Sequence, residues 1–424
     1  MSVPGRRLAG GVAGRESGLV GACESMVRTS VCLPERRCPE RKIRRMSSAA
    51  FDSTSGHAGQ VRFFNPGPVW VRPQVLEALG GPMMSHRSAA FSDLYGRILE
   101  KLPKVFRTTG QAHTLATSAT GFWEAGLVSC ATGPVLACCN GSFSDKWGEM
   151  SQKLGLETTL LKAEGGKPIL ADDVKKALAE KKFQIVTVVH NETSVGTISD
   201  LASIAKVVHE NSDALLFADV VTSLAATRVE ADEWGLDLAV CGSQKALALP
   251  PGIAVFSVSE KALAAARQKK FRGIYLDLLD VEAFGKKKQN PTTPSLPLLY
   301  ALDVQLDHIL AEGLENRWAR HHEMLAAVEE WAPKAGFRFL PDAPAHSPSV
   351  SSLFPPEGVG AEDLNKAMKA AGWVPGSGYG KFKSSNIRIG HMGDVDVASV
   401  KNVLAAYAEQ AAKILAATPA AAKA

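Results

Sequence analysis

Short apolar runs rich in β-branched residues alternate with amphipathic segments along the middle of the chain. Two of those segments, 171–182 and 200–210, repeat apolar residues at helical spacing, and Asp200 stands where it can cap the second. Strands that alternate with helices predict right-handed crossovers and a mostly parallel sheet covered on both faces. The predicted strands are 113–118, 134–140, 184–190, 214–221, 236–243 and 253–259.

Beyond about residue 294 the pattern changes. One long helical stretch is predicted first, over 297–331, and a mixture of short strands and helices follows it. The predicted strands are 337–340 and 349–354, and the predicted helices are 361–371 and 395–416. We therefore predict a large α/β domain over 61–300, and a connecting helix with a smaller α+β domain over 301–416.

The two ends of the chain lack this periodicity. Residues 1–60 are rich in Arg, Gly and Ser, which predicts a disordered or removed extension, and Met46 is an alternative start. We expect the Ala-rich tail 417–424 to fray. The expected compartment is the cytoplasm, or an organelle such as the mitochondrion if the Arg-rich leader is a transit peptide.

Charge and cysteine content narrow the possible partners. The net charge is +5, and residues 1–48 contribute +6 of it, so the body is nearly neutral and gives no electrostatic case for nucleic acid or membrane. No apolar run is long enough to span a bilayer. The body cysteines lie in apolar runs without a CxxC pair, which favours buried thiols of a reducing compartment and no metal.

The ends of the predicted strands carry the candidate chemistry, because ligands of open parallel sheets bind at the carboxyl edge. Ser118, Ala119 and Thr120 open a helix whose backbone N–H groups suit a phosphate, although an ordinary N-cap explains them as well. Phe143 follows the second strand as a ring that could stack on a ligand or pack in the core. The third strand ends in the polar cluster 190–194.

The next two strands deliver an acid and an amine. Asp219 ends a strand that is too apolar to be exposed, so its carboxylate needs a donor or a cation. Lys245 follows with apolar neighbours, and a desolvated lysine becomes the nucleophilic amine that imine chemistry requires. A phosphate cradle, a ring, a carboxylate and a lysine at one edge fit pyridoxal 5′-phosphate (PLP).

At these residues the sequence resembles the class V aminotransferases of PLP-dependent fold type I, close to the alanine-glyoxylate and serine-glyoxylate (serine-pyruvate) enzymes. The similarity runs from Asn65-Pro-Gly-Pro68 and Met84-Ser-His-Arg-Ser88 to Arg388-Ile-Gly-His-Met-Gly393, and it is most specific at Gly242-Ser-Gln-Lys-Ala-Leu247 followed by Pro250-Pro-Gly252. The resemblance implies a seven-stranded sheet and an aminotransferase with a ping-pong mechanism. It also implies small substrates, alanine or serine with glyoxylate or pyruvate.

The resemblance also implies roles for single residues. Lys245 would be the catalytic imine lysine, Asp219 would pair with the pyridine nitrogen, and Ser194 would bond the 3′-hydroxyl. Gln244, Ser118, Ala119 and Thr120 would hold the phosphate, Phe143 and Val221 would flank the cofactor, and Thr293 would reach the phosphate of the neighbouring subunit in a homodimer with shared sites. Two positions depart from the family pattern: Phe143 replaces a Trp of some relatives, and Ala119 replaces a common glycine.

Arg388 ends an apolar strand-like run of the small domain. A planar guanidinium can clamp a substrate α-carboxylate with two hydrogen bonds, as the matching arginine of the family does, whereas a salt bridge to Asp394 or Asp396 is the plain alternative. His391 and Tyr379 could shape the pocket or simply pack.

Other activities remain open within the same fold. A cysteine desulfurase is disfavoured because Cys241, the last cysteine, precedes Lys245. An aminoethylphosphonate transaminase or a lyase of this fold stays possible. A scaffold that has lost its chemistry is disfavoured because the lysine and the aspartate are both present, and a nucleotide-binding protein is disfavoured because no Gly-rich Walker loop or GxGxxG follows the first strand.

Overall fold

The structure is a computed structural model that describes residues 61–417. The predicted extension 1–60 and residues 418–424 of the predicted tail lie outside the described residues.

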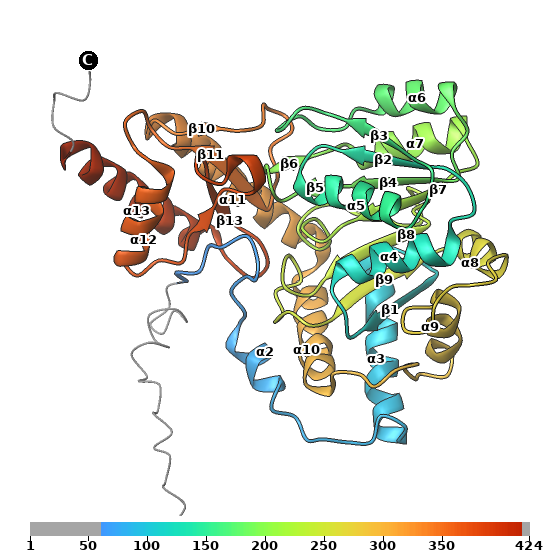
Figure 1. The fold of residues 1–424 in the computed structure, drawn as a ribbon. Coiled ribbons are helices and arrows are strands. Elements are labelled where there is room, and N and C mark those ends of the chain that lie inside the picture. The colour runs from blue at the N-terminus through green and yellow to red at the C-terminus, as the bar shows by residue number, and fades with distance from the viewer. Residues whose placement is uncertain (1–60, 418–424) are drawn as a thin grey trace, which may run out of the picture. The chain divides into compact units, whose positions relative to one another are not determined.

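A seven-stranded sheet forms the centre of the larger part of the structure (Figure 1). Its strand order is β1-β9-β8-β7-β4-β2-β3, and only β9 runs against the others, which confirms the mostly parallel sheet. The strands are β1 (Gln111–Leu115), β2 (Val135–Cys139), β3 (Thr158–Lys162), β4 (Ile185–Val189), β7 (Leu215–Asp219), β8 (Leu238–Gly242) and β9 (Ala254–Val258).

Helices cover both faces of this sheet, and each face has its own apolar core. Alternate residues of one strand point to opposite faces, so Val186 and Val188 of β4 join one core while Ile185 and Val189 join the other. The first core is closed by α2 (Pro73–Ala78), α3 (Ala89–Phe106), α6 (Ala171–Glu180), α7 (Leu201–Asn211) and α10 (Leu296–Glu312). The second is closed by α4 (Ala119–Cys130), α5 (Ser142–Lys153), α8 (Glu260–Arg267) and α9 (Leu278–Gly285).

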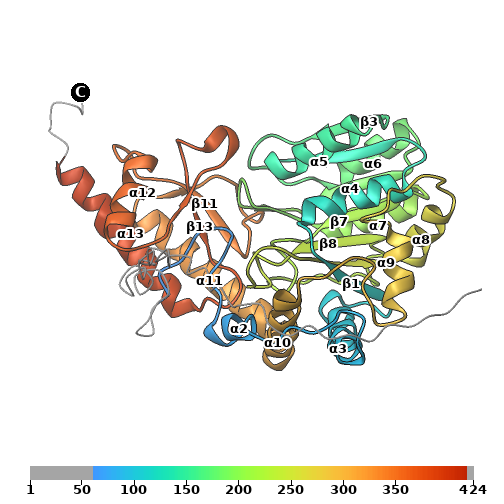
Figure 2. The ribbon, with the colours of Figure 1, turned by 60° about the horizontal axis from the view of Figure 1, so that its bottom comes forward.

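A four-stranded antiparallel sheet lies in the C-terminal part of the chain and packs against helices (Figure 2). Phe64, near the start of the described residues, packs into the apolar core of this sheet. The strands are β10 (Arg338–Phe339), β11 (Val350–Phe354), β13 (Ile387–Gly390) and β12 (Gly376–Ser377), and the helices are α11 (Leu314–Lys334), α12 (Ala361–Ala370) and α13 (Val397–Ala417). Smaller elements are the hairpin of β5 (Asn191–Glu192) with β6 (Thr197–Ile198) and the 3₁₀ turn η1 (Gly380–Phe382).

The connecting helix and two strands of the large sheet differ most from the sequence prediction. The single helix expected over 297–331 is two helices, because Gly313 between α10 and α11 takes a φ of +82° that an α-helix does not allow. The strand expected over 113–118 is 111–115, because residues 116–118 already lead into α4, with Ser118 as its extended N-cap. Strand β3 was not among the predicted strands. The prediction that Asp200 caps the following helix is confirmed, since its side chain accepts a hydrogen bond from the Ser203 backbone N–H.

Candidate active site

Lys245 lies in the turn that follows β8, at the carboxyl edge of the sheet. Its Nζ donates a hydrogen bond to the Pro66 carbonyl and lies 5.8 Å from the ring centroid of Phe143. Burial, together with the nearby charge of Arg388, lowers the pKa of Lys245 to about 7, although Asp219 and Glu192 act in the opposite direction. A large fraction of the amine is therefore neutral and nucleophilic near neutral pH.

Asp219 is the last residue of β7 and only 4% of it is exposed. Its Oδ2 accepts a hydrogen bond of 2.9 Å from Trp123 Nε1, and its Oδ1 accepts one of 2.9 Å from the Val221 backbone N–H. Burial raises the pKa of Asp219 to about 7 despite these bonds. The carboxyl group thus changes ionisation easily when a charged partner approaches it.

Trp123 is a site residue that the sequence analysis missed. It comes from α4, and its indole stacks on Trp147 of α5 with ring centroids 5.2 Å apart. The need of a buried Asp219 for a donor was visible in the sequence. The identity of that donor was not, because it depends on how α4 packs over β7.

Phe143 and Ser194 meet at the start of α5. The Ser194 hydroxyl donates to Glu192 Oε1 at 2.6 Å and accepts from the Ser142 backbone N–H at 3.0 Å. The Phe143 ring stacks on Tyr379, with centroids 5.2 Å apart and an interplanar angle of 21°. The residues that follow β2 and the polar residues that follow β4 therefore lie close together, as the sequence predicts from their position at one edge of the sheet.

The phosphate candidates are placed at the start of α4. Ser118 is the N-cap of this helix but its side chain makes no capping hydrogen bond, and Ala119 and Thr120 form the first turn. The ordinary capping role, in which the Ser118 side chain would accept a hydrogen bond from the first turn of the helix, is therefore not observed. Gln244 precedes Lys245, and its backbone carbonyl accepts from the Val69 N–H at 3.1 Å.

Thr293 stands apart from this group. It is exposed on the segment before α10, and within residues 61–417 no hydrogen bond or ring contact joins it to the other candidates.

Arg388 lies in β13 with 8% exposure. Its Nε donates to the Ser377 carbonyl at 2.8 Å, its Nη1 donates to the Thr193 carbonyl at 3.0 Å, and its guanidinium carbon is 5.3 Å from the centroid of Tyr379. Burial lowers the pKa of Arg388 to about 10, so it stays protonated at neutral pH.

The alternative of a salt bridge from Arg388 is not observed. Asp394 pairs with Arg72 and Arg317 instead, and Asp396 accepts from the Ser399 backbone N–H. Arg388 therefore carries a positive charge that neither of the two expected carboxylates neutralises.

His391 and Tyr379 have different surroundings. His391 is fully buried, and its Nε2 lies 2.9 Å from Ser351 Oγ, which is a packing position. Tyr379 is 43% exposed and lies between Phe143 and Arg388.

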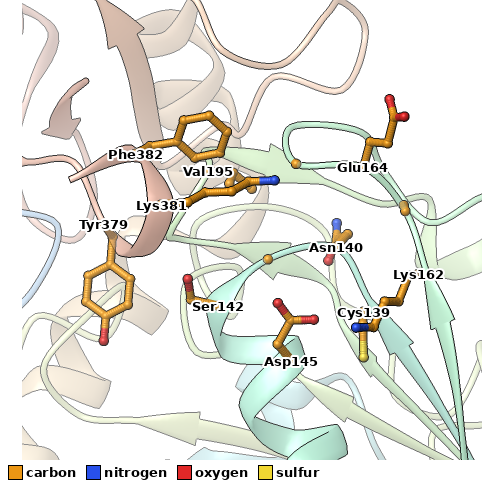
Figure 3. Close-up of a pocket in the computed structure, with 13 residues that line it drawn as sticks. Cys139, Asn140, Ser142, Asp145, Lys162, Glu164, Val195, Tyr379, Lys381 and Phe382 are labelled. Atoms are coloured by element: carbon orange, nitrogen blue, oxygen red, sulfur yellow. The ribbon is translucent and has the colours of Figure 1, made fainter. Parts of the chain in front are cut away.

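A cavity of about 330 Å³ opens beside this group (Figure 3). Asn140 and Ser142 line it from the loop between β2 and α5, Tyr379 and Lys381 line it from the segment at η1, and Lys162 lines it from the end of β3. Both acidic and basic side chains line the cavity, which suits a small polar ligand.

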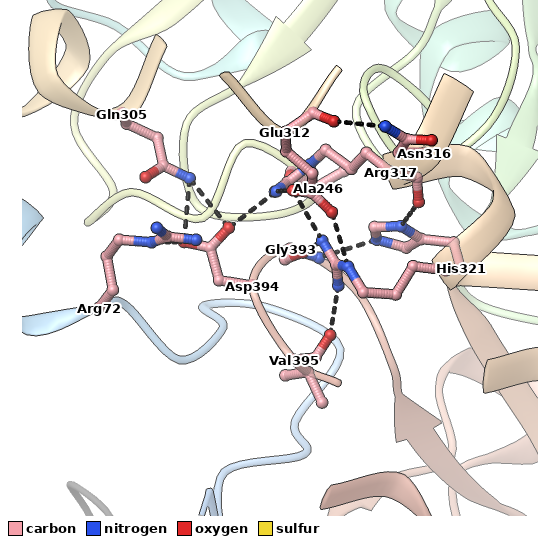
Figure 4. Close-up of polar contacts among 11 residues, drawn as sticks. Arg72, Ala246, Gln305, Glu312, Asn316, Arg317, His321, Gly393, Asp394 and Val395 are labelled. Carbon is pink, nitrogen blue, oxygen red and sulfur yellow. Dashed lines mark hydrogen bonds and ion pairs between the residues drawn. The ribbon is translucent and has the colours of Figure 1, made fainter. Parts of the chain in front are cut away.

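A buried ionic network contacts the turn that carries Lys245 (Figure 4). Arg317 Nη1 pairs with Asp394 Oδ1 at 2.9 Å, and Asp394 Oδ2 pairs with Arg72 Nε at 2.6 Å. Arg317 Nη2 also donates to the carbonyl of Ala246, the residue after Lys245. The small sheet is thereby connected to the turn that carries the lysine.

Two features of the described residues concern metal ions and membranes. Among the described residues, no group of three or more His, Cys, Asp or Glu side chains is arranged to hold a metal ion. No helix in that same part of the chain has the length and apolar character needed to cross a membrane.

Residues 141–374 match the family model described as Aminotransferase class-V. The chain belongs to the class-V aminotransferases. The family depends on PLP, and the matched region includes Phe143, Ser194, Asp219 and Lys245.

Curated proteins similar to this aminotransferase carry several names. It is 36% identical to a protein of Synechococcus sp. named soluble hydrogenase, small subunit, over 78% of this chain and 87% of the relative. It is 36% identical to serine–glyoxylate aminotransferase of Methylorubrum extorquens, over 82% of this chain and 90% of the relative. Two further relatives are named L-aspartate–glyoxylate aminotransferase and (S)-ureidoglycine–glyoxylate transaminase.

Solved structures agree with the aminotransferase fold. An aspartate aminotransferase of Thermus thermophilus, 31% identical, superposes with a TM-score of 0.76 over 83% of this chain and 99% of that chain. This similarity confirms the predicted fold type I architecture.

Proposed function

We propose that this class-V aminotransferase moves an amino group from a small α-amino acid to a 2-oxo acid, with PLP held at Lys245. The observation that carries the proposal is the placement of a lysine of pKa about 7 against the ring of Phe143. Asp219 and Arg388 approach the same edge of the sheet. The donor set fits PLP because it offers an amine, an aromatic face, a buried carboxyl group and a helix N-terminus.

Each residue would have a separate task. When bound, PLP supplies an aldehyde for the amine and a ring that withdraws electrons from the substrate α-carbon. Lys245 Nζ would remove and return the proton at that carbon, since its neutral form is available near pH 7. Asp219 would hold a proton on the pyridine nitrogen.

The remaining candidates would position the cofactor and the substrate. Ser118, Ala119, Thr120 and Gln244 would hold the phosphate, Val221 and Phe143 would flank the ring, and Ser194 would bond the 3′-hydroxyl. Arg388 would bind the substrate carboxylate, and its lack of an ion pair with Asp394 or Asp396 supports that role.

The exposed position of Thr293 supports the proposal that a second copy completes the site. Because Thr293 makes no hydrogen bond or ring contact with the other candidates in the described part of its own chain, a phosphate-binding role would require the site of a neighbouring subunit. We therefore propose a homodimer with shared active sites.

Alanine or serine as donor and glyoxylate or pyruvate as acceptor are the proposed substrates. The names of several relatives support glyoxylate as acceptor, while their donors differ.

The test is the visible absorption spectrum of the purified protein with PLP, before and after the addition of alanine, serine or aspartate one at a time. We expect a yellow lysine-bound form that bleaches with the true donor, and no such form in Lys245→Ala. If PLP produces no band in the wild-type protein, the cofactor assignment is wrong. If a band forms but no amino acid changes it, the transamination proposal is wrong.

A further inference from the structure

Glu192 is a fully buried carboxylate that none of the roles above uses. Its side chain has 0% exposure at the end of β5. The β5–β6 hairpin fixes its backbone, because Gly196 closes a tight turn at φ +71° and donates to the Glu192 carbonyl at 3.0 Å. No Lys, Arg or His among residues 61–417 forms an ion pair with it. A buried anion of this kind must be stabilised by hydrogen-bond donors.

Two groups of donors surround this carboxylate. Oε2 accepts from the backbone N–H of Ser144 at 2.9 Å, from the Ser144 hydroxyl at 3.0 Å and from the backbone N–H of Phe143 at 3.2 Å. Oε1 accepts from the backbone N–H of Ser194 at 3.1 Å and from the Ser194 hydroxyl at 2.6 Å. One side chain therefore ties Phe143 to Ser194.

The sequence of α5 explains why this carboxylate is needed. The N-cap position is Gly141, which has no side chain to accept from the first turn of the helix. A Cβ at position 141 would lie 2.6 Å from Ser194 Oγ and 2.7 Å from the Glu192 carboxyl carbon. The absent side chain thus leaves the room in which Glu192 caps the helix from another segment, and its negative charge suits that end of the helix.

The same contacts determine the direction of the Ser194 hydrogen bond. A serine hydroxyl has one proton, and here that proton is donated to Glu192. One oxygen lone pair accepts from the Ser142 N–H, so the other lone pair is what Ser194 can offer to a ligand. Ser194 therefore presents an acceptor toward the site, and a group bonded to it must donate a proton.

We propose that Glu192 is a positioning residue that holds the Phe143 ring and the Ser194 acceptor in one geometry for PLP. The proposal rests on the proposed function and deepens it. Glu192 acts through its two neighbours and does not touch the reacting atoms. Because Ser194 can then only accept a hydrogen bond, the site would favour a cofactor whose 3′-oxygen carries a proton.

Glu192→Gln is the decisive variant because it keeps the shape and removes one acceptor. The amide oxygen can serve only one group of donors, so the amide NH₂ faces either α5 or Ser194. We expect PLP to dissociate about tenfold more readily, the visible circular dichroism per bound PLP to fall, and the absorption maximum to move toward the deprotonated 3′-oxygen form. In cofactor-free protein, hydrogen exchange should accelerate in peptides that cover 139–150. Glu180→Gln, an exposed position of α6, is the matched control.

The outcomes separate this inference from the proposed function. A wild-type protein that forms no PLP band contradicts the proposed function and, with it, the cofactor role of Glu192. A wild-type band with an unchanged affinity, circular dichroism and exchange in Glu192→Gln overturns the Glu192 inference alone. If Glu192→Gln does not fold, Ser194→Ala removes only one side of the arrangement. The inference then requires weaker PLP binding, with faster exchange confined to the Ser142 amide that loses its Ser194 acceptor, and equal PLP affinity overturns it.

Discussion

Asp394→Asn tests whether the ionic network of Figure 4 holds the two sheets and the lysine turn together. The Asp394 side chain is 1% exposed and lies between Arg317, which is fully buried, and Arg72, which is 25% exposed. Gln305 Nε2 also donates to it, at 3.1 Å. The substitution keeps the shape, removes the charge and turns an NH₂ group toward one of the arginines.

The expected loss follows from these contacts. Breaking a buried ion pair by removing one partner costs about 3–5 kcal/mol, because the other charge stays buried without compensation. Arg317 keeps Glu312 at 2.8 Å, and the partly exposed Arg72 regains contact with water. We therefore expect the lower end of that range, about 3 kcal/mol of the free energy of unfolding.

The assay is urea unfolding at pH 7, with Asp363→Asn as the control. Asp363 pairs with Lys366 at 3.1 Å, but both side chains are more than half exposed, so its loss should be below about 1 kcal/mol. A loss for Asp394→Asn that is no larger than the control value would refute the reasoning.

The pH dependence gives a second check on the same variant. Burial by itself raises the pKa of Asp394, but the charges of Arg317 and Arg72 and their hydrogen bonds outweigh it and leave the pKa below its ordinary value. A carboxyl group whose pKa is lowered on folding adds stability above its unfolded pKa of about 3.9, and that stability disappears as pH falls through the folded value. The stability difference between wild type and Asp394→Asn should therefore shrink at acid pH.

The remaining predictions concern the site itself. Lys245→Ala should abolish transamination even when PLP is retained, which a stopped assay of oxo acid product checks; near-normal turnover would contradict the mechanism. Arg388→Ala should raise the KM for the amino acid at least about tenfold, and unchanged kinetics would remove its substrate role. Trp123→Phe deletes the indole donor to Asp219, so the pKa of Asp219 should rise above about 7 in the cofactor-free protein. Infrared titration of the carboxyl band measures this pKa, and an unshifted value would show that the hydrogen bond does not stabilise the carboxylate.

The strands differ in how clearly the sequence reveals them. β2, β4, β7, β8 and β9 are buried throughout, so each appears as a short, mostly apolar run. Thr158–Lys162 forms the edge of the sheet and is mostly half-buried, so it lacks that signal. The sequence also does not reveal that a helix ends at Gly313, because a glycine within a helical pattern can continue the helix or end it.

The site residues also differ in how far the sequence alone predicts them. Asp219 and Lys245 were predictable because parallel strands bring their carboxyl ends to one edge, and topology alone places those residues near each other. Trp123, Glu192 and Arg317 depend on how helices and hairpins pack around that edge. Their partners are 96, 48 and 77 residues away in the chain, and no local pattern indicates such pairs.

The ionic network joins segments that a ribosome synthesises at very different times. The segments that form the network are spread over most of the described chain and contribute Arg72, Ala246, Arg317 and Asp394. A ribosome-bound chain exposes the lysine turn long before Asp394 leaves the exit tunnel, so the turn lacks its full support while translation continues. We expect stable PLP binding only after Asp394 has emerged and folded into the network, which would keep shorter, unfinished chains from binding PLP.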